Sequence, residues 1–132
     1  MENPNPNSAK IRKLTTISRE AVDKHDYENH APLIEVVAVF ALPKGKTRPL
    51  RCLIDSGATD NFIHSNLIKE YKLETTALED EIILGSAENK AQAEGETKPL
   101  TMEIGHHCKH RSVYTVLDLG DYDVVLGRPF QN

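Results

Sequence analysis

Short apolar runs separated by turn-forming residues dominate the chain from residue 32 onward, and this pattern predicts β-strands. The run at residues 33–42 is rich in β-branched and other apolar residues, which predicts a strand buried on both faces. Residues 43–46 predict a turn, after which residues 48–55 return as the second strand of a hairpin. On that strand, alternation places Leu50, Cys52 and Ile54 on one face, and Arg51, Leu53 and Asp55 on the other.

A helical spacing of apolar residues follows this hairpin. The residues concerned are Phe62, Ile63, Leu67, Ile68 and Tyr71. They predict one short helix, with Asn61 or Ser65 as its N-cap and His64 on its solvent-exposed face.

The remaining part of the chain again predicts strands. Residues 81–95 predict a second hairpin, which Gly85 would loosen and whose tip is polar. The other expected strands are residues 100–104 and 112–117, joined by a loop over residues 105–111, and a buried strand from residue 122 that ends at Gly127. The whole pattern predicts a small, mainly β domain with one short helix.

The first 31 residues differ from the rest. They begin with a polar, proline-interrupted stretch, and only scattered apolar residues follow it. We expect a flexible N-terminal extension or linker over residues 1–31 and a folded domain over residues 32–132. Residues 10–30 could form a weak helix or a strand-like arm, and the sequence leaves these two alternatives open.

Length and charge narrow the classes of function. The chain has 132 residues, which fits one domain. Its formal net charge is −4, and acids and bases are interspersed, so no surface for nucleic acid is indicated. No apolar run approaches the length of a membrane span, and the N-terminus lacks the apolar core of a signal peptide. We therefore expect an intracellular protein that binds neither nucleic acid nor membranes.

The sequence gives little support for thiol or metal chemistry. Two cysteines, Cys52 and Cys108, are too few for a disulfide framework, so reduced thiols are expected, although a single bridge is left open. Cys52 lies on an inward strand face, which favours a core role over a nucleophile. Residues 106–110 contain zinc-type ligands, but neighbours in an extended loop point alternately apart and no second cluster exists. We interpret them as a solvated hairpin tip and expect no metal or organic cofactor.

The most informative segment is Leu53-Ile54-Asp55-Ser56-Gly57-Ala58. Two apolar strand residues lead into a carboxylate, and a tight turn follows at once. Gly57 permits backbone geometry and close approach that a side chain would block, and Ser56 can hydrogen-bond within the turn. A carboxylate in such a place is either costly or catalytic. Ser56 is a poor candidate nucleophile, because the Gly-x-Ser-x-Gly pattern is absent.

This segment resembles the active-site turn of retropepsin-like aspartic proteases. Val124-Val125-Leu126-Gly127 resembles the second signature of that family, an apolar triplet and a glycine that pack beside the catalytic turn. The hairpin at residues 84–93 lies between the two signatures, where the family has its flap. The form Asp-Ser-Gly-Ala-Thr and the Phe-Ile after it are most similar to the protease of gypsy-type LTR retrotransposon polyproteins. The resemblance covers roughly residues 32–130.

The resemblance implies a single-lobe acid protease fold and an aspartic endopeptidase that processes a retrotransposon-type polyprotein. Because the chain contains one Asp-Ser-Gly-Ala, the second carboxylate would come from a second copy, so a homodimer is implied. A cytoplasmic location, virus-like particles included, is implied as well. The implied residues are catalytic Asp55, the supporting Ser56, Gly57, Ala58 and Gly127, and the substrate-binding flap residues Gly85, Ser86, Ala87, Glu88, Asn89 and Lys90.

The chain also departs from the viral members of the family. Thr59 stands where they have an acid and Asp60 follows one residue later, so the acidic partner of Arg128 is left open. The chain ends two residues after Phe130, without the C-terminal strand through which viral subunits interlock, so other contacts would have to hold a dimer. An alternative function is therefore a catalytically inactive dimerisation or peptide-binding module of the same fold.

Overall fold

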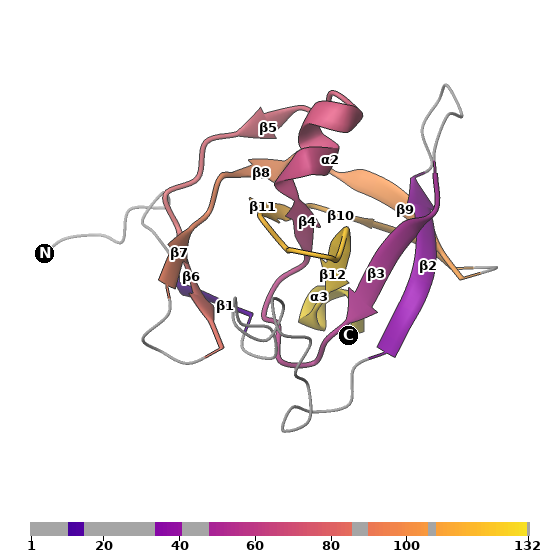
Figure 1. Ribbon diagram of the computed structural model, residues 1–132, viewed down its shortest axis with the longest axis horizontal. Coiled ribbons are helices and arrows are strands. Elements are labelled where there is room, and N and C mark those ends of the chain that lie inside the picture. Colours follow the sequence, from indigo (N-terminus) through magenta and orange to yellow (C-terminus); the bar gives the residue numbers. More distant parts are fainter. Residues whose placement is uncertain (1–10, 15–33, 41–47, 86–89, 106–107, 132) are drawn as a thin grey trace, which may run out of the picture.

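A computed structural model describes residues 11–14, 34–40, 48–85, 90–105 and 108–131 of the chain (Figure 1). These residues form a small, mainly β domain, so the fold class predicted from the sequence is confirmed. The large sheet has the order β10–β9–β2–β3–β12–β4–β11–β8–β5, and the small sheet has the order β1–β6–β7. The strands of the large sheet are β2 (Ile34–Phe40), β3 (Leu50–Ile54), β4 (Phe62–His64), β5 (Thr75–Thr76), β8 (Gly95–Thr97), β9 (Leu100–Ile104), β10 (Cys108–Ser112), β11 (Thr115–Leu117) and β12 (Val124–Leu126). The small sheet contains β1 (Ile11–Leu14), β6 (Glu81–Leu84) and β7 (Lys90–Gln92), and the helices are α2 (Ser65–Glu70) and α3 (Arg128–Gln131).

Three neighbouring strands, β3, β12 and β4, form the centre of the large sheet. β12 is parallel to β3 and antiparallel to β4, so it lies between two strands that follow one another in the sequence. Paired side chains form two rows across these strands: Leu53, Val125 and Phe62 in one, and Cys52, Val124 and Ile63 in the other. Both rows are completely buried, so this central strip is covered on both faces, as its continuous apolar sequence requires.

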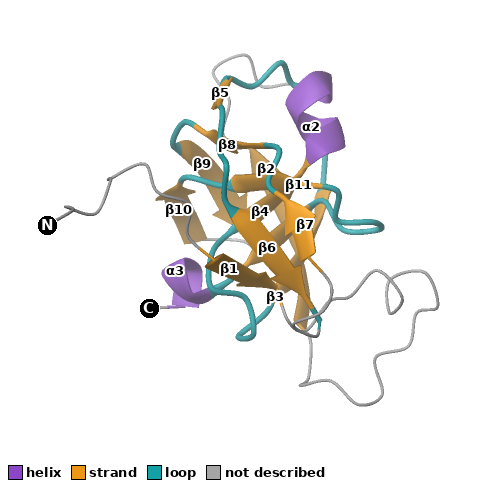
Figure 2. Cartoon of the chain, turned by 90° about the vertical axis from the view of Figure 1, so that its left-hand side faces the viewer, coloured by secondary structure: helices purple, strands orange, loops and turns teal. Residues whose placement is uncertain are grey.

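Each row faces its own hydrophobic core. The row that contains Leu53 packs with Leu14 of β1 and Ile82 of β6, so the small sheet covers this face of the strip (Figure 2). The row that contains Cys52 belongs to the second core, which also includes Leu67 of α2. The alternation predicted for the strand before Asp55, with Cys52 and Leu53 on opposite faces, is confirmed.

The N-terminal segment contributes strand β1 to the fold. Of the two alternatives for residues 10–30, a weak helix or a strand-like arm, residues 11–14 adopt the strand. β1 runs parallel to β6, which itself forms the predicted second hairpin with β7. Leu14 is completely buried, so β1 packs into a core although it lies within the expected extension. The division of the chain at residue 31 stays a prediction.

The first predicted strand is buried on one face only, so the expectation of burial on both faces is wrong. β2 pairs with β3 on one side and β9 on the other. Ala38 and Phe40 point into the core, whereas Val37 on the opposite face is 59% exposed. Ile34 shares the face of Ala38 but begins the strand, and it is 57% exposed. The apolar run predicted the strand, but it could not reveal which of its faces would be covered. The turn predicted at residues 43–46 lies outside the described residues.

Helix α2 is shorter than predicted, and its cap is a different residue. Residues 62–63 belong to β4, because strand pairing with β11 and β12 overrides their helical spacing. The N-cap is His64, whose Nδ1 accepts a hydrogen bond from the backbone N–H of Asn66 at 3.1 Å. Neither Asn61 nor Ser65 is therefore the cap, and His64 is buried instead of solvent-facing.

The segment predicted as a loop at residues 105–111 contains strand β10. β10 is antiparallel to β9, with Cys108 opposite Ile104, and the predicted strand at residues 112–117 is replaced by the end of β10 and by β11. β10 lies at an edge of the large sheet, where charged side chains are common. Because its residues are mostly polar or charged, they lack the apolar pattern that predicts a strand. Part of the expected hairpin tip is therefore strand, while His106 and His107 lie outside the described residues.

The two thiols should differ strongly in reactivity. Cys52 is buried, and burial, together with the charge of Asp123, raises the pKa of its thiol to about 12. Cys108 is exposed on the edge strand. In native protein we expect iodoacetamide to label Cys108 while Cys52 stays unmodified, because the thiolate is the reacting form; denaturation should make both react. Peptide mass spectrometry measures this difference, and equal native labelling of both thiols would contradict the assigned burial.

Candidate active site

Asp55 lies immediately after β3, where that strand ends beside β12. Its backbone N–H donates to the carbonyl oxygen of Leu126 at 3.0 Å, which extends the parallel pairing of the two strands. The residue is almost completely buried, with 1% of its surface exposed. Burying a carboxylate removes its hydration, so such a position requires polar contacts within the protein.

The residues after Asp55 form a tight turn, called here the Asp55 turn (residues 55–61). The N–H of Ala58 donates to the carbonyl oxygen of Asp55 at 3.1 Å, which closes the turn. The N–H of Gly57 donates to Asp55 Oδ1 at 2.8 Å, which orients the carboxylate. Ser56 is exposed, Gly57 is half-buried and Ala58 is completely buried. The small side chain of Ala58 is therefore the one that packs beneath the turn.

Gly127 follows β12 and lies against the Asp55 turn. A Cβ at this position would lie 2.6 Å from the carbonyl oxygen of Ala58 and would also clash with that of Asp60, so no larger residue fits. The N–H of Gly127 donates to Asn61 Oδ1 at 2.9 Å, and the N–H of Arg128 donates to the carbonyl oxygen of Ala58 at 3.0 Å. Two successive backbone donors therefore hold the turn from the end of β12.

Strand β1 also holds the Asp55 turn. The N–H of Lys13 donates to Thr59 Oγ1 at 2.9 Å, and the N–H of Thr59 donates to the carbonyl oxygen of Lys13 at 2.9 Å. Leu14 and Ala58 form an antiparallel bridge beside them. Because β1 also pairs with β6, this short strand joins the Asp55 turn to the β6–β7 hairpin.

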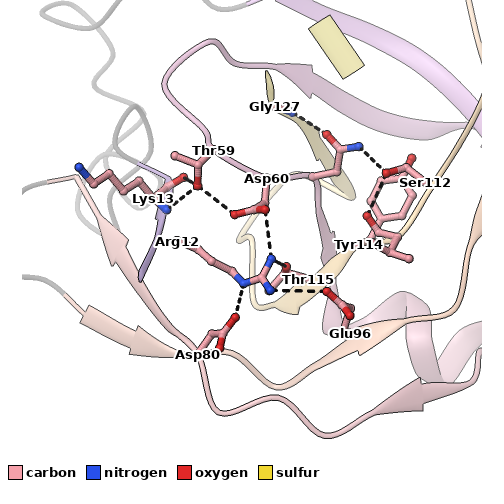
Figure 3. A network of polar contacts seen from close by, with 12 residues as sticks. Arg12, Lys13, Thr59, Asp60, Asp80, Glu96, Ser112, Tyr114, Thr115 and Gly127 are labelled. Carbon is pink, nitrogen blue, oxygen red and sulfur yellow. Dashed lines mark hydrogen bonds and ion pairs between the residues drawn. The ribbon is translucent and has the colours of Figure 1, made fainter. Parts of the chain in front are cut away.

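The side chain of Arg12 extends this connection (Figure 3). Its guanidinium nitrogens lie 2.7 Å from Asp80 Oδ2, 3.1 Å from Asp60 Oδ1 and 3.5 Å from Glu96 Oε2. Arg12 also donates to Thr115 Oγ1 at 3.1 Å, and only 5% of the residue is exposed. One buried cation thus contacts the Asp55 turn, the start of the β6–β7 hairpin and two strands of the large sheet.

Asp60 faces Arg12, which resolves the question that the sequence left open for Arg128. Thr59 Oγ1 donates to Asp60 Oδ2 at 2.9 Å, so both residues at the altered family position join the same polar network. Arg128 is exposed, and its backbone N–H donates to the Asp55 turn.

The β6–β7 hairpin occupies the place predicted for the flap. Gly85 follows β6 with a φ of 62°, a left-handed conformation that favours glycine, and its N–H donates to the carbonyl oxygen of Leu14 at 3.3 Å. Lys90 begins β7 and is exposed. The predicted flap residues Ser86, Ala87, Glu88 and Asn89 lie outside the described residues, so their contacts with a substrate stay predictions.

Three residues that hold this site, Arg12, Asn61 and Asp80, are not predicted by the sequence pattern. Arg12 lies in the expected extension, and only the buried apolar residue two positions later, Leu14, could have suggested a packed strand. Asn61 was considered only as a helix cap. Asp80 belongs to an acidic run that predicts a solvated start to the hairpin, yet it is 4% exposed. All three depend on partners that are distant in the sequence.

Neither metal ligands nor a membrane span is found in the described part of the chain. Within those ranges, no group of three or more His, Cys, Asp or Glu side chains could hold a metal ion. No helix among the same residues is long and apolar enough to cross a membrane. The candidate site contains the buried, oriented carboxylate of Asp55, a group of the kind that serves in general acid–base catalysis.

Comparison with protein families decides the relationship of the chain. A family model described as the PEG10/RTL1 protease domain matches residues 51–131, more than half of the chain, including the Asp55 turn and Gly127. The chain belongs to this family. The PEG10/RTL1 protease domain is retropepsin-like and derived from gypsy-type retrotransposons, so the resemblance stated from the sequence is confirmed. Membership indicates a polypeptide substrate. A search of curated proteins found no match.

Asn61 should be required for the stability of this PEG10/RTL1-type domain. It is 2% exposed, and its Nδ2 donates to Ser112 Oγ at 3.2 Å while its Oδ1 accepts from Gly127. Asn61→Ala removes the acceptor of a buried N–H. We expect the free energy of unfolding to fall by about 1–3 kcal/mol, measured by chemical denaturation.

Asn66→Ala is the matched control. Asn66 is exposed on α2 and binds His64 through its backbone N–H, which the substitution keeps. The free energy of unfolding should change by less than about 0.5 kcal/mol. Equal losses in the two variants would show that Asn61 has no special role.

Proposed function

We propose that the domain is an aspartic endopeptidase that is active as a homodimer. Each subunit contributes one Asp55, and the two carboxylates share one proton because like charges at close range cannot both ionise. The ionised carboxylate takes a proton from water, and the protonated one activates the carbonyl of the scissile peptide bond. The observation that carries this proposal is the buried, oriented Asp55 at the end of a central strand in a protease-family chain.

The fixed backbone around Asp55 supports a catalytic role. Its N–H is bound to Leu126 and its carbonyl oxygen accepts from Ala58, so the main chain is held on both sides of the carboxylate. Proton transfer depends on groups kept within hydrogen-bonding distance, so a rigid turn suits this chemistry. Ser56 is exposed beside Asp55, and its hydroxyl is assigned to supporting contacts across the dimer.

The substrate is an extended segment of a polyprotein of the retrotransposon type. The β6–β7 hairpin, with Gly85 as its hinge, covers that segment as a flap, and binding occurs through main-chain hydrogen bonds in the manner of an added strand. Residues 86–90 supply the contacts of the flap tip. Processing takes place in the cytoplasm, within virus-like particles where these assemble, and it uses no metal or organic cofactor.

Asp55→Asn is the decisive variant. Asparagine keeps an oxygen that can accept from Gly57, so the turn should stay folded while the ionisable group is lost. We expect peptide cleavage at mildly acidic pH to fall at least about a thousandfold. Wild-type cleavage should rise with the dimer fraction when sedimentation and rates are measured on the same samples.

A mixing experiment tests the shared site directly. Excess Asp55→Asn chain, added to a fixed amount of wild type, should suppress cleavage because mixed dimers hold one aspartate. Asp121→Asn, which changes an exposed carboxylate, is the control and should not suppress it. Undiminished cleavage in the mixture would contradict a shared site. A stable wild-type dimer that cuts no peptide would favour the inactive dimerisation or peptide-binding module.

A further inference from the structure

The surroundings of Arg12 are unusual for an arginine in a small domain. Its guanidinium is within 3.5 Å of three carboxylates, those of Asp60, Asp80 and Glu96, and it is almost completely buried. A buried charge is tolerated only when it is well paired, and a planar guanidinium can serve several oxygens at once because its donors point in fixed, different directions. The geometry therefore depends on arginine in particular, because a lysine ammonium is a compact single charge.

The partners of Arg12 come from separate parts of the proposed active site. Asp60 belongs to the Asp55 turn. Asp80 directly precedes β6, and its backbone carbonyl accepts from the N–H of Ala93 at 3.0 Å just after β7, so it fixes the base of the β6–β7 hairpin. Glu96 lies in β8 of the large sheet. The ion pairs thus connect the turn, the hairpin and the sheet through one side chain.

The backbone of β1 repeats the same connection. Lys13 exchanges hydrogen bonds with Thr59 in the turn, and the next residue, Leu14, accepts from the N–H of Gly85 at the end of β6. β1 therefore lies between the Asp55 turn and the β6–β7 hairpin. Moving either one away from the other would break backbone hydrogen bonds on one side of β1 as well as the contacts of Arg12.

We infer that Arg12 is a positioning residue, which fixes the geometry between the Asp55 turn and the base of the β6–β7 hairpin. β1 consequently belongs to the functional protease unit, although it lies outside the residues 51–131 that match the family. The effect of Arg12 on cleavage rests on the proposed function. The connection that Arg12 makes between the turn and the hairpin does not, because the two are joined whether or not peptides are cut.

Amide hydrogen exchange, followed by NMR on the full chain, tests the structural content. The N–H groups of Thr59 and Gly85 report on the two sides of β1, and those of Tyr71 and Leu73, which are bound to carbonyls of α2, report on a remote region. In Arg12→Met we expect exchange at Thr59 and Gly85 to accelerate at least about tenfold while the reporters near α2 stay unchanged. Equal acceleration at all four, or none at any, would overturn the inference.

Arg12→Lys keeps the inference testable if Arg12→Met does not fold. Lysine retains the positive charge but cannot contact all three carboxylates with a planar fork, so selective acceleration at Thr59 and Gly85 should persist in weaker form. Arg48→Lys and Arg48→Met are matched controls, because Arg48 also contacts two carboxylates, Glu70 and Asp123, but its side chain is 46% exposed. These controls should leave exchange at Thr59 and Gly85 as in the wild type, whereas the reporters beside α2 are not used for them because Arg48 contacts Glu70 of that helix. Wild-type exchange at Thr59 and Gly85 in a folded Arg12→Lys would overturn the inference.

Cleavage kinetics give the second readout. In Arg12→Lys, kcat/KM should fall about 10- to 100-fold at a dimer fraction matched to wild type, because small displacements of reacting groups slow the chemical step strongly. Arg48→Lys should cleave as wild type does. If wild type and Arg12→Lys cleave equally, the positioning role is overturned. If wild type itself cuts nothing, the proposed function fails, and the exchange rates alone decide the role of Arg12.

Discussion

The close approach of Gly127 to the Asp55 turn is the constraint on which the rest of the site depends. β12 lies between β3 and β4, so the turn that joins these two strands must cross the end of β12. No space is left there for a side chain, and the contacts are made by the backbone N–H of Gly127 and by Asn61. The next N–H, that of Arg128, donates to the carbonyl oxygen of Ala58, so the turn is held by one bond to the Asn61 side chain and one to its own backbone. The position of Asp55 is therefore set by the strand order of the sheet, because that order places the Asp55 turn against the end of β12.

The same arrangement explains how a small domain can keep a carboxylate buried. Both faces of the central strip are packed, by the row of Leu53 on one side and by the row of Cys52 on the other. Because β3 is covered on both faces, it cannot tilt to expose the side chain of Asp55, which follows it, to water. The cost of burying Asp55 is thus imposed by core packing, and the Gly57 N–H offsets part of it. In the proposed homodimer the two Asp55 carboxylates would share one proton, so only one negative charge would have to be accommodated at the shared site.

The sequence predicted those parts of the site whose determinants are local. Alternation placed Cys52 and Leu53 on opposite faces, and the turn residues after Asp55 stand next to one another in the chain. The helical spacing after the turn was misleading at Phe62, because that residue pairs with Val125 of β12, and no local pattern reveals a partner so far along the chain. Arg12 was missed for the same reason. An arginine in a polar N-terminal segment is normally solvated, and only the meeting of Asp60, Asp80 and Glu96 makes it a buried cation.

The position of β1 also limits which motions the hairpin can make. The flap proposed above would have to open for a substrate to enter, yet Gly85 after β6 is hydrogen-bonded to Leu14, and the base of the hairpin is bound to Arg12 through Asp80. β6 therefore cannot swing away from the Asp55 turn as a rigid arm without breaking its pairing with β1. Opening that leaves these bonds intact has to take place beyond Gly85, whose left-handed backbone marks the end of the held strand. For the flap proposed above, the strand that holds the turn would thus also set where the hairpin can bend, so that bending beyond Gly85 would leave the contacts between β1 and the Asp55 turn in place.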